Sequence, residues 1–151
     1  MWRELRRFRP ADLDRHDIDY RAWVRRQMAA GKFLAFVVDD GSGRPVASGA
    51  LWLMPSQPRP GPLGRGEVPY VLSMFTDRRH RGLGVASRIV QEMIAWARAR
   101  RYGRLVLHAS RFGRPVYERL GFENGSEMRL ALPRGRSARR ARRSRSRAGR
   151  A

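Results

Sequence analysis

One stretch of the chain limits the possible fold more than any other, because a strand, a polar turn, a glycine-containing hexamer and an amphipathic helix follow one another without interruption. Residues 68–76 have strand composition and residues 77–81 form the turn. From Gly84 to Arg101 apolar residues recur at helical spacing, and Arg residues occupy the last turn, where cations suit the helix dipole. We expect Gly103 to end this helix. The hexamer itself is Arg81-Gly82-Leu83-Gly84-Val85-Ala86.

The hexamer has the properties of a phosphate site. Gly82 and Gly84 remove side chains where a backbone must approach a ligand, and amides at a helix start have no partners inside the helix. The macrodipole adds partial positive charge, and Arg78, Arg79 and Arg81 lie in the same turn. A Walker loop is excluded by the missing Lys and spacing, and a Rossmann fingerprint by Ser87. If the hexamer is considered by itself, a strand–helix turn that binds no ligand remains an alternative interpretation.

The N-terminal third predicts a helix and a hairpin. Residues 2–8 have strand composition, and from Ala11 onward apolar residues recur as in one long helix or two short ones, with Asp12 as the N-cap and Gly31 at the C-terminal end. The further expected elements are strands at 33–38 and 45–53 joined by a turn at 39–43, a loop at 54–66, a strand at 105–107, a loop at 109–113, a helix at 115–120 closed by Gly121, and last-strand material at Phe122 and 127–132.

This element order predicts an α/β fold with a mixed sheet in one domain, residues 1–133. The net charge is +20, and the nine Arg of residues 134–151, with no acid, account for about half of it. That tail has nothing to bury, so we expect it to be disordered and to offer non-specific nucleic-acid contact. Codon bias is the simpler reason for the dominance of Arg over Lys.

Composition also narrows the location and the chemistry. The chain has no Cys, and its three His residues (16, 80 and 108) have unrelated spacings, so no metal site is expected. No apolar run is long enough for a membrane span, and the charged start leads into no secretory signal. We therefore expect a cytoplasmic protein without a membrane partner, as a monomer or a homodimer.

Two blocks of residues resemble the GNAT superfamily of acyl-CoA-dependent N-acyltransferases. Arg81, Gly84 and Ala86 match that family's Gln/Arg-x-x-Gly-x-Gly/Ala motif, and Ser-Met-Phe-Thr precedes it. Pro115 to Phe122 is similar to the closing Tyr-x-x-x-Gly-Phe helix. The resemblance implies a mostly antiparallel sheet, splayed between its central strands and covered by helices on both faces. It also implies acetyl-CoA as cosubstrate.

The resemblance implies roles for single residues as well. The backbone of Met74, Phe75 and Thr76 would pair with the pantetheine arm, and the amides from Gly82 to Ala86 would hold the pyrophosphate. Tyr117 would protonate the departing thiolate, since a phenol with an ordinary pKa of about 10 is a proton donor at neutral pH. Many relatives have an Asn seven residues before this Tyr to contact the cofactor, and here that position is Ser110.

The general base and the acceptor are less defined by the resemblance. Glu67 is the first candidate for the base, followed by His108 and then Asp39 or Asp40, while His80 is expected to contact cofactor or solvent. The family takes its acceptor specificity from the first helices and the loop before the central strand, here the acid-rich residues 12–20 and the loop 54–66. The implied activity is direct acetyl transfer to a primary amine of a small molecule or protein. A nucleic-acid-associated basic protein and an inactive acyl-CoA sensor remain as alternatives.

Overall fold

The structure, a computed structural model, describes residues 9–58, 60, 66–128 and 130. It contains one four-stranded sheet in the order β1-β2-β3-β4. The first three strands are antiparallel neighbours, and β4 is parallel to β3. The elements are α1 (Pro10–Ala29), β1 (Phe33–Asp39), β2 (Pro45–Pro55), β3 (Glu67–Thr76), a 3₁₀ turn (Arg78–His80), α2 (Val85–Ala99), β4 (Val106–Leu107) and α3 (Arg114–Arg119).

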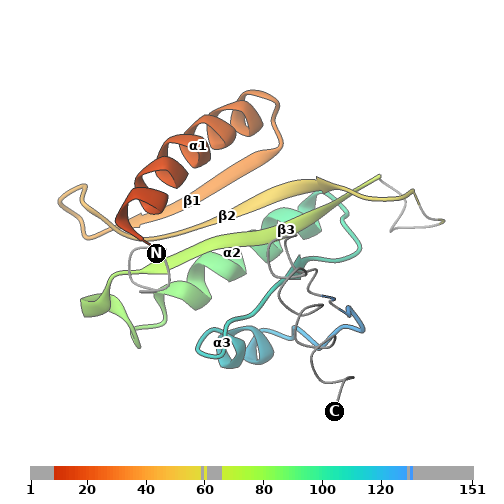
Figure 1. Cartoon of the computed structure of the whole chain (residues 1–151). Coiled ribbons are helices and arrows are strands. Elements are labelled where there is room, and N and C mark those ends of the chain that lie inside the picture. Colours follow the sequence, from red (N-terminus) through yellow and green to blue (C-terminus); the bar gives the residue numbers. More distant parts are fainter. Residues whose placement is uncertain (1–8, 59, 61–65, 129, 131–151) are drawn as a thin grey trace, which may run out of the picture.

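Helices cover the sheet on both faces, as the resemblance implied (Figure 1). On one face Leu51 of β2 and Val71 of β3 pack against Met93 of α2 in a cluster that excludes water. On the other face the Trp23 ring of α1 meets the Trp52 ring of β2 edge-on, with centroids 5.3 Å apart. Alternate residues of a strand point to opposite faces, so β2 supplies side chains to both layers. No helix of the described residues is long and apolar enough to cross a membrane.

The hairpin of β1 and β2 forms as predicted, but the helix ends differ from the predictions. The N-cap of α1 is Arg9, with Pro10 opening the helix, and Asp12 lies in the first turn, bonded to the Arg9 side chain at 2.9 Å. Proline starts the helix there because its fixed φ suits the first turn. Gly31 follows the helix with φ 66°, as expected.

Helix α2 ends at Ala99, before the predicted Gly103. Arg101 has φ 57° and reverses the chain, so that the Tyr102 ring stacks on Trp96 with centroids 5.7 Å apart. The chain therefore turns at Arg101, two residues before the predicted Gly103, and the stacking contact stabilises this turn. In α3 the helix begins one residue earlier than predicted, at Arg114.

The predicted last strand is wrong for its described residues, which adopt no strand conformation: Phe122, Glu127, Met128 and Leu130. Side chains tie this segment down in place of a backbone ladder: the Asn124 side chain accepts a hydrogen bond from Arg114 at 2.5 Å. The other residues of that prediction, the predicted strand at 2–8, part of the loop at 54–66 and the Arg-rich tail lie outside the described residues.

Candidate functional site

The centre of the site is a fork between two strands. β3 pairs with β2 from one end to the other, whereas its opposite edge meets β4 only at Tyr70 and Val71. From Leu72 to Thr76 no strand of the described residues pairs with that edge. The expected splay of the central strands is therefore confirmed. Unpaired strand edges carry N–H and C=O groups that are ready to hydrogen-bond an extended ligand.

A β-bulge lies on β3 where the fork opens. Ser48 pairs with Phe75 and Ala50 with Leu72, so that Gly49 of β2 faces two residues, Ser73 and Met74. Ser73 has φ 54°, a left-handed conformation that non-glycine residues seldom adopt. The Met74 side chain turns toward α2, and a Cβ at Gly49 would lie only 2.3 Å from its sulfur. The bulge therefore packs closely against the α2 side of the sheet, and this packing requires glycine at position 49.

The glycine turn continues directly from this edge. Gly82 and Gly84 have φ 81° and 78°, and a Cβ built on either meets nothing within 4 Å. The Arg88 amide donates to the Gly84 carbonyl at 3.0 Å, so the amides before it lie at the open start of α2. The Arg81 Nε donates to the Thr76 carbonyl at 2.9 Å and ties the turn to the end of β3.

The charge around the turn suits an anion. Arg78, Arg79 and Arg81 are exposed here. The nearby Asp77 is engaged, since its carboxylate accepts the Arg79 backbone N–H at 3.0 Å and this bond lowers the pKa of Asp77. His80 lies 3.9 Å from the same carboxylate. A carboxylate bonded in this way competes little for the helix amides.

Tyr117 lies on α3, beside the chain that leaves β4. Its ring meets Phe122 edge-on, with centroids 5.7 Å apart, and burial raises the pKa of its phenol. The ring also lies close to Gly113, where a Cβ would stand 3.1 Å from Tyr117 Cε2 and 3.3 Å from the Ser110 Oγ. Ser110 accepts the Gly113 backbone N–H at 3.1 Å. The residue at the expected cofactor position therefore also fixes the start of α3.

Three of the candidate bases lie away from the fork. Glu67 begins β3, where its carboxylate binds the Lys32 ammonium at 2.7 Å and accepts the Tyr102 hydroxyl at 2.5 Å. The hairpin turn engages the other two carboxylates: Asp39 accepts the Gly41 amide at 2.8 Å, and Asp40 accepts the Ser42 amide at 3.0 Å and its hydroxyl at 2.6 Å.

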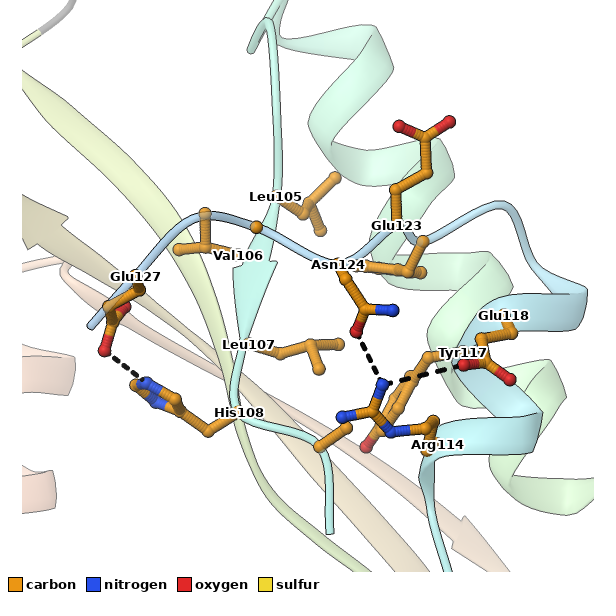
Figure 2. Close-up of a pocket in the computed structure, with 13 residues that line it drawn as sticks. Leu105, Val106, Leu107, His108, Arg114, Tyr117, Glu118, Glu123, Asn124 and Glu127 are labelled. Atoms are coloured by element: carbon orange, nitrogen blue, oxygen red, sulfur yellow. Dashed lines mark hydrogen bonds and ion pairs between the residues drawn. The ribbon is translucent and has the colours of Figure 1, made fainter. Parts of the chain in front are cut away.

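His108 lies at the fork itself, as the first residue after β4. One ring nitrogen hydrogen-bonds the Tyr70 hydroxyl, and the other lies 2.8 Å from the Glu127 carboxylate (Figure 2). This gives a chain of three groups drawn from β3, the residue after β4 and the segment after α3. Tyr70 and Glu127 were not singled out in the sequence, because no local spacing links residues that come from three separate segments.

Two cavities adjoin the fork. One, of about 590 Å³, lies between β4, α3 and the segment that follows α3, and Tyr117 and Arg114 line it (Figure 2). The second, of about 990 Å³, lies between α1 and the sheet, and we name it the aromatic chamber; its lining includes Tyr20, Trp23, Trp52, Tyr70, His108 and Glu127. In the part of the chain that the structure describes, no cluster of three His, Asp or Glu residues could hold a metal ion.

Comparisons with known proteins agree on one family. The model of the acetyltransferase (GNAT) family matches residues 1–122. A GCN5-related N-acetyltransferase from Ralstonia eutropha JMP134 is 28% identical, with a TM-score of 0.75 over 87% of this chain and 85% of that one. A predicted acetyltransferase from Clostridium acetobutylicum, solved with acetyl-CoA, is 24% identical, with a TM-score of 0.70 over 78% and 74%. No curated protein matches the chain.

Proposed function

The chain belongs to the acetyltransferase (GNAT) family, and we propose that it transfers the acetyl group of acetyl-CoA to a primary amine of a small molecule or protein by direct attack. One observation carries the proposal: the edge of β3 that no strand of the described residues pairs with runs into the glycine turn, and Arg81 links the two through Thr76. An extended ligand on that edge would therefore lead to the helix start, where amides and Arg side chains favour a pyrophosphate. The similar Clostridium structure contains acetyl-CoA.

The residues of this chain have separate tasks in the proposed cofactor site. Backbone groups of Met74, Phe75 and Thr76 hold the pantetheine arm, and the amides of residues 82–86 hold the diphosphate. The Ser110 hydroxyl keeps a proton to donate, since its oxygen accepts from Gly113. The open space beside Gly82 and Gly84 fits such a ligand, because no Cβ obstructs the approach. Bound acetyl-CoA would supply the acetyl group as an activated thioester.

The proton steps are assigned to His108, acting through Tyr70, and to Tyr117. As the amine nitrogen bonds to the carbonyl carbon and the carbon–sulfur bond breaks, the Tyr70 hydroxyl takes the proton from the amine and passes its own proton to the His108 ring nitrogen that it contacts. Tyr117 gives its proton to the leaving sulfur, and the raised pKa of its phenol keeps it protonated at neutral pH. Backbone N–H groups of the β3 edge stabilise the charge on the carbonyl oxygen. Glu67 stays the competing candidate for the base.

The test separates binding from transfer. Acetyl-CoA binding is measured by calorimetry, and transfer by thiol release over a panel of amines. Tyr117→Phe should lower kcat at least about 100-fold while the Kd of acetyl-CoA stays unchanged. Equal turnover of the two proteins removes Tyr117 from the mechanism. Binding without transfer to any amine supports the inactive sensor, and no binding refutes the proposal.

The base is identified by two matched amide variants. His108→Gln should remove the acidic limb of the pH profile of kcat/KM, which reports the base in the free enzyme. Glu67→Gln should lower stability through the lost contact with Lys32 but leave that limb in place. The reverse result assigns the base to Glu67.

The Arg-rich tail is proposed to act separately. Its nine positive charges suit non-specific phosphate contacts. Deletion of residues 134–151 should abolish salt-sensitive nucleic-acid binding and leave the Kd of coenzyme A intact. Loss of both would refute this separation.

A further inference from the structure

The aromatic chamber is walled by rings that are already fixed. Trp23 of α1 contacts Trp52 of β2 edge-on at 5.3 Å and Phe33 of β1 at 5.6 Å. The Trp52 indole N–H also donates to the Gln27 side chain at 3.2 Å. Rings held by such contacts present a preformed apolar surface, and a ligand does not have to order them when it binds.

One wall of the chamber is polar, whereas the rest is mainly aromatic and apolar. Tyr70 and His108 lie at the mouth of the fork, and Glu127 bonds His108 from the far side. The chamber therefore places a carboxylate and an imidazole beside the edge of β3 that is proposed to hold the thioester. An ammonium group is attracted to a carboxylate and to aromatic faces, so an amine would enter with its nitrogen at this end.

The opposite end disfavours a second positive charge. Arg104 lines the chamber two residues before Val106, toward the end of the sheet where β3 and β4 are still paired. The chain as a whole is strongly cationic. A polyamine would thus meet repulsion at that end. The charges favour a single amine at the Glu127 end, and the aromatic and apolar walls favour an uncharged body between the two ends.

We propose that the aromatic chamber binds the acceptor and that the acceptor is a small primary amine carried on a flat aromatic or similarly apolar body. This inference rests on the proposed acetyl transfer and names its substrate class. A cavity of about 990 Å³ holds a ligand of that size, with its body between the rings and its nitrogen at His108. The apolar walls supply affinity, and the polar end supplies orientation.

The first experiment compares amines on the wild-type protein. Transfer is measured for 2-phenylethylamine and tryptamine against ethanolamine and spermidine, together with a peptide that has a free N-terminus. We expect kcat/KM to be at least about tenfold higher for the two aromatic amines, which matches a modest difference in apolar burial. The proposal is overturned if ethanolamine, spermidine or the peptide is preferred.

A binding readout separates this inference from the activity on which it rests. Trp23 and Trp52 line the chamber, so bound 2-phenylethylamine should change tryptophan fluorescence with and without coenzyme A. Saturable binding of aromatic amines without transfer leaves the chamber intact and refutes the activity. Acetyl-CoA binding without any amine response overturns the chamber alone.

A pair of variants locates the binding. Trp52→Leu removes one wall and should raise KM for 2-phenylethylamine about tenfold while the Kd of acetyl-CoA stays unchanged. Trp96→Leu is the matched control, because Trp96 lies on α2 beside Tyr102. Trp52→Phe keeps an aromatic wall and should retain most of the affinity, which preserves the test if the leucine variant does not fold. Equal effects of Trp52→Leu and Trp96→Leu, or a loss in Trp52→Phe as large as in Trp52→Leu, would overturn the assignment.

Discussion

Two glycine turns in this molecule have similar glycine φ angles but differ in the hydrogen-bond partners of their amides. Gly41 and Gly43 in the β1–β2 hairpin both have φ 85°, and Gly82 and Gly84 before α2 have φ 81° and 78°. A Cβ on any of the four meets nothing within 4 Å. Glycine spacing and open space alone therefore do not distinguish a binding turn from a connecting one.

The difference lies in what occupies the amides. In the hairpin, Asp39 and Asp40 accept the Gly41 and Ser42 amides, so the turn supplies its own anions. The turn before α2 ends at Gly84, an N-cap residue without a side chain, and the helix amides remain directed outward. A glycine turn is a candidate anion site when no carboxylate of the surrounding chain accepts its backbone amides.

The largest expected effect comes from placing the same side chain in both turns. Gly84→Val should weaken coenzyme A binding about 100-fold, because a β-branched residue is strained at positive φ and would obstruct the diphosphate. Gly43→Val carries similar strain and should lower stability without changing the Kd. Calorimetry and thermal melts of the two variants give the comparison, and equal losses of affinity would show that strain alone is responsible.

A second variant would make the binding turn resemble the hairpin. Leu83 is 69% exposed, so Leu83→Asp places a carboxylate beside the helix amides without disturbing the core. We expect at least about a tenfold increase in the Kd of coenzyme A, since the new charge competes with the diphosphate. Leu83→Asn has nearly the same shape and no charge, and should bind almost as the parent does. If the two variants bind equally, the amides are not the anion site.

A smaller effect is expected from the Arg side chains. Arg81→Gln should raise the Kd of coenzyme A several-fold and reduce its salt dependence. Arg98→Gln, at the exposed far end of α2, is the charge-matched control and should leave both unchanged. Titrations at low and high salt measure the difference, and identical salt slopes for the two variants would argue against a charge contact at Arg81.

The smallest effect concerns the hairpin carboxylate. The Ser42 hydroxyl and amide donate to Asp40 and lower the pKa of that carboxyl. A lowered pKa stabilises the fold above the unfolded-state value, and this contribution fades as pH falls through the folded-state pKa, below about 4. Asp40→Asn should therefore lower the melting temperature slightly at pH 7 and by less at pH 2.5, with coenzyme A binding unchanged. An equal shift at both pH values would contradict the assignment.

Much of the local structure could be predicted from the sequence. The hairpin strands, the central strand, α2 and Gly31 follow from alternation, helical spacing and turn residues close together in the chain. The errors occurred where distant contacts compete with local signals. Trp96 draws Tyr102 back before Gly103 can end α2, and the segment after α3 bonds to His108 and Arg114 through side chains in place of a strand ladder.

The site was predictable only in part, for the same reason. The glycine turn and the Tyr117 block are local patterns, and the structure joins the turn to the β3 edge through Arg81. The bulge at Ser73 and the Tyr70–His108–Glu127 chain depend on the register between strands and on residues brought together from three segments. No pattern along the sequence encodes such pairings.

The extra residue on β3 has a consequence for how the sheet could change. Ser48 pairs with Phe75 and Ala50 with Leu72, so excision of Ser73 would leave Gly49 opposite Met74 and would join the two halves of the ladder in unbroken step. The flanking side chains would keep their faces. The β-bulge next to the fork is thus a one-residue insertion into an otherwise regular strand, and loss of a single codon would remove it while the sheet keeps its architecture.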